Sequence, residues 1–253
     1  MRLRERVAVV TGSAKGLGRA VAQRFAREGA SVIAADIDER EGEALVQILK
    51  GEGLEARFVA TDISDENSVK QLMSAATREY GRIDILYNNA AVLCSEQEGL
   101  LHEMKSESWN YILGINLSGP FYCSKYAIPS MLKNGGGSII HTGSPTGLTG
   151  CAPMLPAYSV SKGGIAALTL VMAAAYAPHN IRVNSIVPGT MDTPMNRYIL
   201  NDPQTREAFR RDVPLGRLGK PEDIEGIAVF LASDESSYCT GSTYMCDGGL
   251  TNL

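Results

Sequence analysis

Tyr158 and Lys162 are four residues apart in an apolar stretch that has the pattern of a helix. At that spacing both side chains lie on one face of the helix. A phenol has an unperturbed pKa of about 10 and is a poor base near neutral pH, but a neighbouring ammonium group favours its ionised form. The pair could therefore exchange a proton with a hydroxyl or carbonyl group. Taken alone, the same spacing more often marks an ordinary pair on a helix surface.

Three glycines, Gly12, Gly16 and Gly18, follow an apolar run at residues 7–10 and lead into a helical pattern. In a turn from strand to helix, the first glycine allows the tight turn and the second lets a pyrophosphate approach. The third lets the helix pack closely on the strand. The start of the helix adds free N–H groups and a partial positive charge. This segment is predicted to bind a dinucleotide; a glycine-rich turn without a ligand is the alternative.

Asp36 ends the next apolar run, 18 residues after Gly18. An acid at that place can accept hydrogen bonds from an adenosine ribose, and it would repel a 2′-phosphate. Lys15 in the glycine loop could instead pair with such a phosphate. Because the Asp36 carboxylate lies at the 2′ position itself, we expect NAD rather than NADP. Asp36 could also be a turn residue, since the sequence Asp36-Ile37-Asp38 could cap the following helix.

Short β-branched runs alternate with longer helical patterns along the whole chain. This regular alternation predicts an α/β fold, a doubly wound Rossmann-type parallel sheet with helices on both faces, in one domain over residues 1–253. The segment 190–215, with three prolines, has the least regular pattern and is expected to form a substrate lid. The expected strands are 7–10, 31–35, 56–60, 83–87, 138–141, 181–187 and 243–246, and the expected helices are 16–28, 39–50, 65–80, 106–132, 158–177 and 221–232.

Composition limits the class of protein. The 253 residues carry a net charge of −4, which argues against nucleic acid as a partner. We find no signal segment and no run of about 18 apolar residues, and therefore expect no membrane span and a cytoplasmic location. Five widely spaced cysteines form no CxxC pair and are expected to be reduced thiols. The three histidines have no metal-ligand spacing, so no metal site is expected.

The spacing Thr-Gly-x-x-x-Gly-x-Gly at residues 11–18 resembles that of the short-chain dehydrogenases/reductases. Further matches to that family follow in the expected order over essentially the whole chain. They are Asp62-Ile63, Asn88-Asn89-Ala90-Ala91, Asn116, Ser144, Tyr158, Lys162, Pro188-Gly189 with Thr193, and Asp247-Gly248-Gly249. The resemblance implies an NAD(P)-dependent enzyme that moves a hydride between the nicotinamide ring and a secondary alcohol or ketone.

The resemblance also implies roles for single residues. Asn116, Ser144, Tyr158 and Lys162 would form the catalytic tetrad. Tyr158 would be the acid or base, and Ser144 would donate to the developing alkoxide. Lys162 would bond the nicotinamide ribose, and Asn116 would hold a water that relays protons. The implied cofactor contacts are Gly12, Ser13, Lys15, Gly16, Leu17, Gly18, Asp36, Ile37, Asp62, Ile63, Asn89, Ala90, Ala91, Tyr158, Lys162, Pro188, Gly189, Met191 and Thr193.

The sequence departs from the family pattern at two places. Ala91 stands where the family usually has glycine, and its methyl group would crowd the backbone near the cofactor or require a negative φ. Ser144 precedes Pro145 and lies 14 residues before Tyr158, where many relatives have 13. The extra residue is expected to bulge the substrate loop and to leave the role of Ser144 intact.

Clues to the substrate are weaker. By resemblance, residues 91–96, 145–156 and 191–213 line its pocket. The composition of 145–156 suits a compact substrate with one apolar side, such as a cyclic alcohol, sugar, polyol or small steroid. The lid arginines could bind an anion or simply form a solvated helix face; they are Arg197, Arg206, Arg210 and Arg211. An NADPH-dependent carbonyl or 3-oxoacyl reductase and a non-catalytic dinucleotide-binding regulator are the alternatives. By resemblance we expect a homotetramer formed through helices 110–131 and 158–176.

Overall fold

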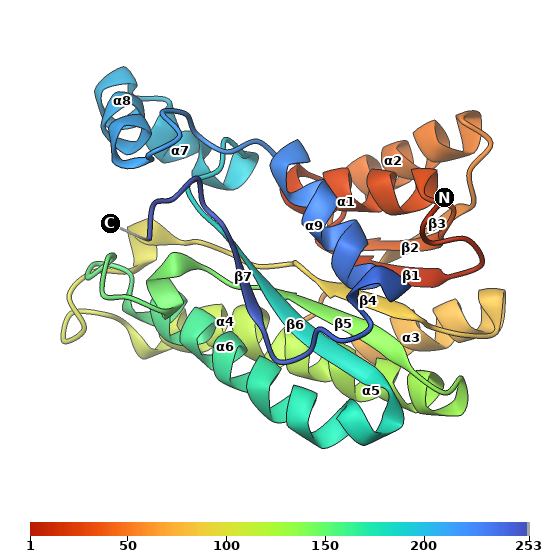
Figure 1. The fold of residues 1–253 in the computed structure, drawn as a ribbon. Coiled ribbons are helices and arrows are strands. Elements are labelled where there is room, and N and C mark those ends of the chain that lie inside the picture. The colour runs from red at the N-terminus through yellow and green to blue at the C-terminus, as the bar shows by residue number, and fades with distance from the viewer. Residues whose placement is uncertain (252–253) are drawn as a thin grey trace.

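The computed structural model describes residues 1–251 and contains a seven-stranded parallel sheet in the order β3-β2-β1-β4-β5-β6-β7 (Figure 1). The strand order reverses between β1 and β4, so the loops that follow these two strands lead to opposite sides. The strands are β1 (Val7–Thr11), β2 (Ser31–Asp36), β3 (Ala56–Ala60), β4 (Ile85–Asn88), β5 (Gly137–Thr142), β6 (Ile181–Pro188) and β7 (Thr243–Cys246).

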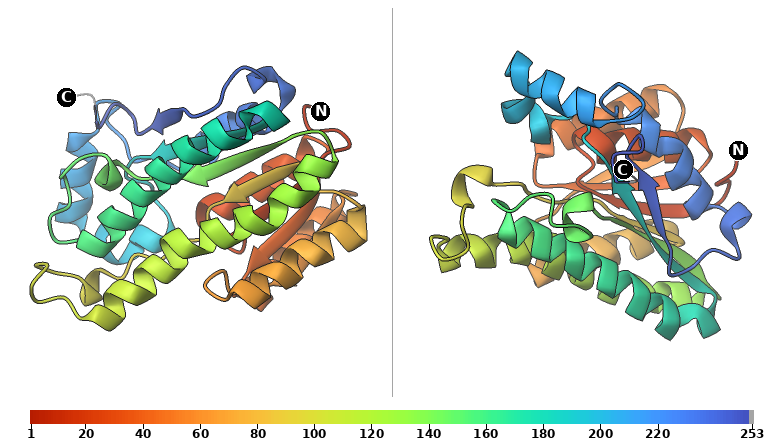
Figure 2. Two further views of the ribbon diagram at one scale, coloured as in Figure 1. Left: turned by 90° about the horizontal axis from the view of Figure 1, so that it is seen from below. Right: turned by 60° about the vertical axis from the view of Figure 1, so that its left-hand side comes forward.

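Helices cover both faces of the sheet, as Figure 2 shows. Helices α1, α2 and α9 pack on one face, and α3, α5 and α6 on the other. The doubly wound fold expected from the sequence is confirmed. The helices are α1 (Gly16–Arg27), α2 (Glu39–Gly51), α3 (Glu66–Tyr80), α4 (Ser106–Leu113), α5 (Gly119–Lys133), α6 (Pro156–Tyr176), α7 (Arg197–Leu200), α8 (Pro203–Asp212) and α9 (Glu222–Ala232).

Continuous apolar runs form the central strands because both faces of the sheet are buried. In β1, Ala8 and Val10 pack under α1 and α9, while Val9 packs under α3 and α5. Side chains alternate between the faces of a strand, so one run contributes to two separate cores. Burying these cores fixes the strands, and with them the loops at their carboxyl ends.

Two predicted segments differ from the structure. The helix expected over 106–132 is wrong as a single element, because a π-helical turn, Gly114–Ser118, separates α4 from α5. The expected irregularity of segment 190–215 is also wrong in part, since it contains α7 and α8. Asp202 accepts the N–H of Thr205 at 2.8 Å and caps α8. Both helices stand apart from the two layers, at the end of the sheet where β6 finishes (Figure 1).

Helix α6 corrects the statement that the chain has no apolar run of about 18 residues. Together with the turn after it, Pro156–His179 is long and apolar enough to cross a membrane by length and composition, although the sequence analysis found no such segment. About a third of the stretch is buried in the protein. Helix α6 packs along β6, and its Lys162 side chain is buried.

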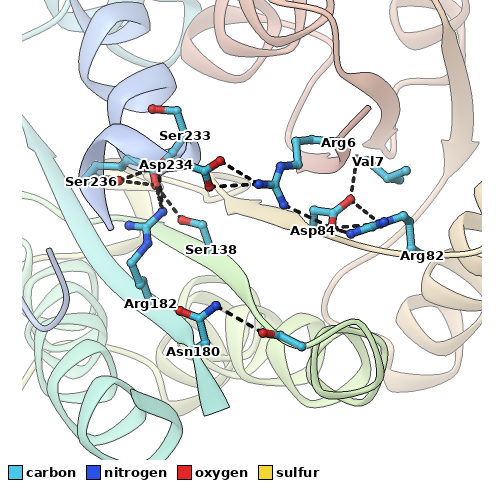
Figure 3. A network of polar contacts seen from close by, with 12 residues as sticks. Arg6, Val7, Arg82, Asp84, Ser138, Asn180, Arg182, Ser233, Asp234 and Ser236 are labelled. Atoms are coloured by element: carbon cyan, nitrogen blue, oxygen red, sulfur yellow. Dashed lines mark hydrogen bonds and ion pairs between the residues drawn. The ribbon is translucent and has the colours of Figure 1, made fainter. Parts of the chain in front are cut away.

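Asp84 is the centre of an ionic network at the amino ends of the strands (Figure 3). Its carboxylate is 3% exposed, accepts the N–H of Val7 at 2.9 Å and pairs with Arg82. Arg6, whose guanidinium lies 3.9 Å from this carboxylate, also donates two bonds of 2.9 Å to Asp234. The network joins β1 and β4 to the segment that follows α9.

The two acids of this network should differ in their contribution to stability. Asp84→Ala leaves the buried N–H of Val7 without a partner, so it should lower the free energy of unfolding by about 1–3 kcal/mol. Asp234→Ala, the control, removes an exposed ion pair and should cost less than about 1 kcal/mol. Urea unfolding of the two variants beside the parent measures both changes. Equal losses would mean that Asp84 does not have the structural role assigned to it.

Candidate active site

A cavity of about 910 Å³ opens at the carboxyl ends of the strands. It lies where the strand order reverses, which is where open α/β sheets bind their ligands. Its walls come from the loops after β1, β2, β4 and β5, from α6 and from the lid segment. The volume is at the upper end of the range for small-molecule sites. The fold therefore brings together, around one space, segments that are far apart in the sequence.

The first turn of α1 forms one wall of this cavity. Lys15, at the N-cap, makes no side-chain capping bond, and the first turn contains no acid. Helices α2, α3 and α8, in contrast, are each capped by an aspartate. The free N–H groups at the start of α1 therefore carry a partial positive charge at the cavity wall, where Gly16 and Leu17 lie. This arrangement fits the diphosphate of a dinucleotide.

The other two glycines of the loop hold its shape. A Cβ on Gly18 would stand 2.0 Å from the carbonyl oxygen of Gly12, so only glycine allows the helix to approach the turn. Gly12 has a φ of 66°, in the left-handed region. Asn89 Nδ2 donates to the carbonyl oxygens of Thr11 at 3.1 Å and Gly12 at 3.2 Å. Asn89 therefore ties the loop after β4 to the loop after β1.

Two aspartates and a lysine form the polar end of the cavity. Asp36 accepts the N–H of Ala14 at 2.9 Å and that of Asp38 at 3.0 Å. Lys15 Nζ lies 2.6 Å from the carboxylate of Asp38, and this pair raises the pKa of Lys15 and lowers the pKa of Asp38. The charge of Lys15 is thus balanced within the chain. Asp38 also caps α2, as the sequence suggested, but its place in the cavity was not foreseen.

Ser144, Tyr158 and Lys162 line the same cavity, as the sequence analysis expects of a catalytic group. Lys162 Nζ lies 5.6 Å from the centre of the Tyr158 ring and donates to the carbonyl oxygen of Thr142 at 2.9 Å. Burial lowers the pKa of Lys162 to about 8. A proton can therefore leave or return to this amine near neutral pH.

Burial raises the pKa of the Tyr158 phenol to about 12, against the opposing effect of the Ser144 hydroxyl. The charge of Glu98 raises this pKa further. The sequence analysis expected Lys162 to favour the phenolate, but in the protein alone the loss of hydration raises the pKa of Tyr158. Without another positive charge in the cavity, Tyr158 is a proton donor.

The Ser144 hydroxyl is oriented by Thr146. The Ser144 oxygen accepts the N–H of Thr146 at 3.3 Å and its hydroxyl at 3.0 Å. A serine oxygen accepts at most two hydrogen bonds and has one hydrogen to donate. With both acceptor positions engaged, the Ser144 hydrogen is left to donate into the cavity, where it bonds the Tyr158 phenol and lowers its pKa. Thr146 belongs to a 3₁₀ turn, Pro145–Gly147, at the start of the loop where the sequence has its extra residue.

Asn116 lies behind the cavity wall. Its amide is fully buried in the π-helical turn, accepts the N–H of Val92 at 2.8 Å and donates to the Val92 carbonyl at 2.9 Å. The wider π turn directs this side chain at the loop after β4, and such turns often occur at functional sites. In the structure Asn116 fixes that loop; its predicted role as holder of a relay water stays a prediction.

The remaining predicted residues divide into two sets. Asp62 accepts from the N–H and hydroxyl of Ser64 in an exposed turn, and Ser13 donates to a backbone carbonyl. Ala91 does not have the positive φ that would strain an alanine. Five predicted residues do not line the cavity: Ser13, Gly18, Asp62, Ile63 and Asn116. The predicted residues that do line it are Gly12, Lys15, Gly16, Leu17, Asp36, Ile37, Asn89, Ala90, Ala91, Ser144, Tyr158, Lys162, Pro188, Gly189, Met191 and Thr193.

Loop and lid residues form the other end of the cavity. Apolar and hydroxyl side chains predominate there, and they include Thr146, Thr149, Ala152, Leu155, Met195, Ile199, Leu200 and Phe209, with Leu250 and Thr251 from the C-terminal segment. The sequence analysis named the loop and lid segments but not Leu250 and Thr251. These two residues follow the Asp247-Gly248-Gly249 motif, and the Asp247 carboxylate accepts the N–H and the hydroxyl of Thr251. Arg206 pairs with Asp192, and Arg210 pairs with Glu207. No lid arginine is among the described cavity residues. This favours the alternative that the lid arginines form a solvated helix face and do not bind an anion.

His141 is buried at the end of β5 and packs as a strand-end residue, the role the sequence analysis favoured. Its Nδ1 lies 3.0 Å from the Thr169 hydroxyl. Burial, with a contribution from the charge of Lys162, lowers the pKa of His141 to about 3. This imidazole is therefore neutral at physiological pH. Within residues 1–251 no three acidic, histidine or cysteine side chains are grouped as a metal site requires.

The comparisons with known proteins agree with this geometry. Residues 12–251 match a family model described as enoyl-(acyl carrier protein) reductase. An uncharacterized oxidoreductase of Bacillus subtilis is 44% identical over 255 residues, which cover 98% of this chain and 92% of the relative. The chain belongs to the short-chain dehydrogenase/reductase family.

Other members of this family cover the chain equally well. Cis-4-hydroxycyclohexanecarboxylate dehydrogenase of Sinomonas cyclohexanicum is 39% identical, over 98% of this chain and 97% of the relative. The crystal structure of a gluconate 5-dehydrogenase from Burkholderia cenocepacia, in complex with NADP and tartrate, is 30% identical. It superposes with a TM-score of 0.94 and covers 100% of this chain and 97% of the other. The protein is therefore an NAD(P)-dependent oxidoreductase of the alcohol and ketone class.

Proposed function

We propose that this short-chain dehydrogenase/reductase oxidises a compact, uncharged secondary alcohol and prefers NAD. The observation that carries the reaction class is that Ser144, Tyr158 and Lys162 line one cavity with the uncapped start of α1. Cyclic alcohols, polyols, sugars and small steroids fit this description. The cavity supports catalysis better than a purely regulatory role, because Ser144, Tyr158 and Lys162 all line it.

Each of these residues has a chemical task. A bound dinucleotide would supply the hydride acceptor and, when oxidised, a positive charge. The start of α1 would hold its diphosphate, and Asp36 would hold its adenosine ribose. Ser144 donates its hydroxyl hydrogen to the substrate oxygen. Tyr158, once its phenolate is favoured, takes the hydroxyl proton, and Lys162, with a pKa of about 8, can pass a proton onward.

The walls of the substrate end support an uncharged substrate. Asp212 is the charged side chain among the described cavity residues of the lid. No lid arginine is among them, and Arg206 and Arg210 are paired with Asp192 and Glu207. The two relatives named above act, by their names, on hydroxy acids. A carboxylate in this cavity would have no arginine to bind and would be repelled by Asp212. We therefore propose that this enzyme differs from them in the charge of its substrate.

A panel of alcohols tests this proposal. NAD reduction, followed by absorbance, should be faster with neutral cyclic alcohols, polyols, sugars or hydroxysteroids than with 4-hydroxycyclohexanecarboxylate or gluconate. Tyr158→Phe should lower kcat by about 100-fold to 10,000-fold, because the proton acceptor is lost. Tyr238→Phe, at a fully exposed tyrosine, is the control.

Three results would contradict this proposal. A rate that survives Tyr158→Phe means that the catalytic assignment is wrong. Faster turnover of the hydroxy acids means that the uncharged-substrate proposal is wrong. If the protein binds a dinucleotide but oxidises no alcohol of the panel, the result would favour the non-catalytic dinucleotide-binding regulator.

The NAD preference rests on the acidic end of the cavity. Asp36 and Asp38 both line this end of the cavity, and the ion pair with Asp38 balances the charge of Lys15. The NADP in the gluconate 5-dehydrogenase structure shows that the family fold also accepts the phosphorylated form. In this chain, binding that phosphate would require breaking the Lys15–Asp38 pair or repelling two carboxylates.

Cofactor choice should respond to Asp38. The parent enzyme should have a higher kcat/KM with NAD than with NADP. Asp38→Ala frees Lys15 to meet the 2′-phosphate, so the NAD/NADP ratio should fall by about tenfold, the effect of one favourable charge contact. Asp65→Ala removes the corresponding cap from α3, away from the cavity, and should leave the ratio unchanged. A parent enzyme that prefers NADP would refute the assignment.

The apolar surface of the long helices supports a homotetramer. Tyr111 of α4, Phe121 of α5 and Leu170 and Val171 of α6 are about half exposed or more. Covering these side chains would remove apolar surface from water. We propose that α4, α5 and α6 form subunit contacts, and that the enzyme acts in the cytoplasm on a small-molecule substrate. Sedimentation as a monomer at every protein concentration would contradict the tetramer.

A further inference from the structure

Glu98 connects the loop after β4 to the catalytic helix. Its Oε2 accepts the N–H of Ala157 at 2.8 Å and the N–H of Tyr158 at 3.1 Å. These are the first free N–H groups of α6, which begins at Pro156. The carboxylate therefore holds the turn of helix from which the Tyr158 side chain projects.

Helix α6 has no cap of its own. Leu155, at its N-cap, has no side-chain oxygen to offer, and Pro156 has no N–H. The aspartates that cap α2, α3 and α8 each precede their helix directly. Glu98 supplies the same bond from 59 residues away, and places a negative charge at the positive end of the helix. The position of the first turn of α6 thus depends on the loop after β4.

The environment of Glu98 is costly for a carboxylate. Its second oxygen, Oε1, is buried and has no hydrogen-bond partner among the described residues. Burial raises the pKa of the Glu98 carboxyl, against the two N–H groups that lower it. An unsatisfied buried oxygen destabilises the fold. The two bonds from the N–H groups of α6 are therefore the contacts that hold this carboxylate in place.

We propose that Glu98 is a positioning residue: it fixes the first turn of α6, and so the direction of Tyr158, by tying that turn to the loop after β4. The proposal rests on the hydride-transfer function above. Asn89 and Asn116 hold the same loop from the other side, through Gly12 and Val92. Through Glu98, the position of the loop after β4 therefore determines the position of Tyr158.

Glu98 also acts on Tyr158 through its charge. The charged groups that face the phenol are Lys162, one turn along α6, and Glu98, from the loop. The carboxylate disfavours the phenolate and raises the pKa of Tyr158. It also raises the pKa of Cys94, together with Glu96, after the larger effect of burial. Removing the Glu98 charge should thus lower the pKa of Tyr158, and a merely structural cap would not do this.

Hydrogen exchange tests the positioning role without any substrate or cofactor. In Glu98→Ala, the amides of a peptide that spans residues 155–160 should exchange faster than in the parent. Glu98→Gln keeps an oxygen that can accept both N–H groups and should protect this peptide more than Glu98→Ala does. Glu96→Gln, at an exposed neighbour on the same loop, should exchange like the parent. Unchanged exchange in Glu98→Ala would overturn the proposal.

The effect of Glu98 on Tyr158 is tested by kinetics with an alcohol that the panel identifies as a substrate. Glu98→Ala should lower kcat by about 10-fold to 100-fold, because the base is displaced from the substrate oxygen, while the KM for NAD stays close to that of the parent. Glu98→Gln should recover part of this loss. In both variants the acid limb of the kcat profile for alcohol oxidation should move to lower pH, since the phenolate forms more easily.

The outcomes separate the two proposals. A profile that does not move in Glu98→Gln, or a loss of kcat that only follows a loss of folded protein on thermal unfolding, would overturn the positioning role. If the parent enzyme oxidises no alcohol, the proposed substrate class fails. The exchange measurement still decides then whether Glu98 holds the first turn of α6.

Discussion

The reversal of strand order between β1 and β4 is the constraint on which the site depends. Loops that leave two neighbouring parallel strands toward opposite faces cannot fill the space between them, so a crevice remains at the carboxyl edge. The start of α1 borders this crevice with uncapped N–H groups, and Asn89 bonds the two loops across it. The apolar cores on both faces hold β1 and β4 in place, and the ionic network around Asp84 joins their opposite ends.

Burial, more than pairwise attraction, determines the proton chemistry of this crevice. Loss of hydration moves the pKa of Tyr158 up to about 12 and that of Lys162 down to about 8, so each group is driven toward its neutral form. A positive charge that enters the crevice would reverse the balance for Tyr158. The positive nicotinamide ring of an oxidised cofactor would supply such a charge.

The sequence predicts those parts of the site that depend on the backbone. Glycines with a required φ or a required close approach leave a pattern, as Gly12 and Gly18 do, and buried strands leave continuous apolar runs. The ion pair of Lys15 with Asp38 leaves no pattern, because it depends on how two loops approach each other. The π turn at Asn116 also leaves no pattern, since its residues have ordinary helical character.

The substrate end shows why composition is a poor guide to a lid. Four arginines between residues 197 and 211 suggest a cationic surface, yet a helix has two sides and only one of them faces the cavity. On α8, Phe209 and Asp212 are three residues apart and turn inward, whereas Arg206 and Arg210 turn to acids outside. Which side faces inward depends on tertiary contacts such as the bond from Leu215 N–H to the Gly248 carbonyl. The charge that a substrate meets is therefore decided by how the lid docks, after the catalytic residues are already fixed by the sheet.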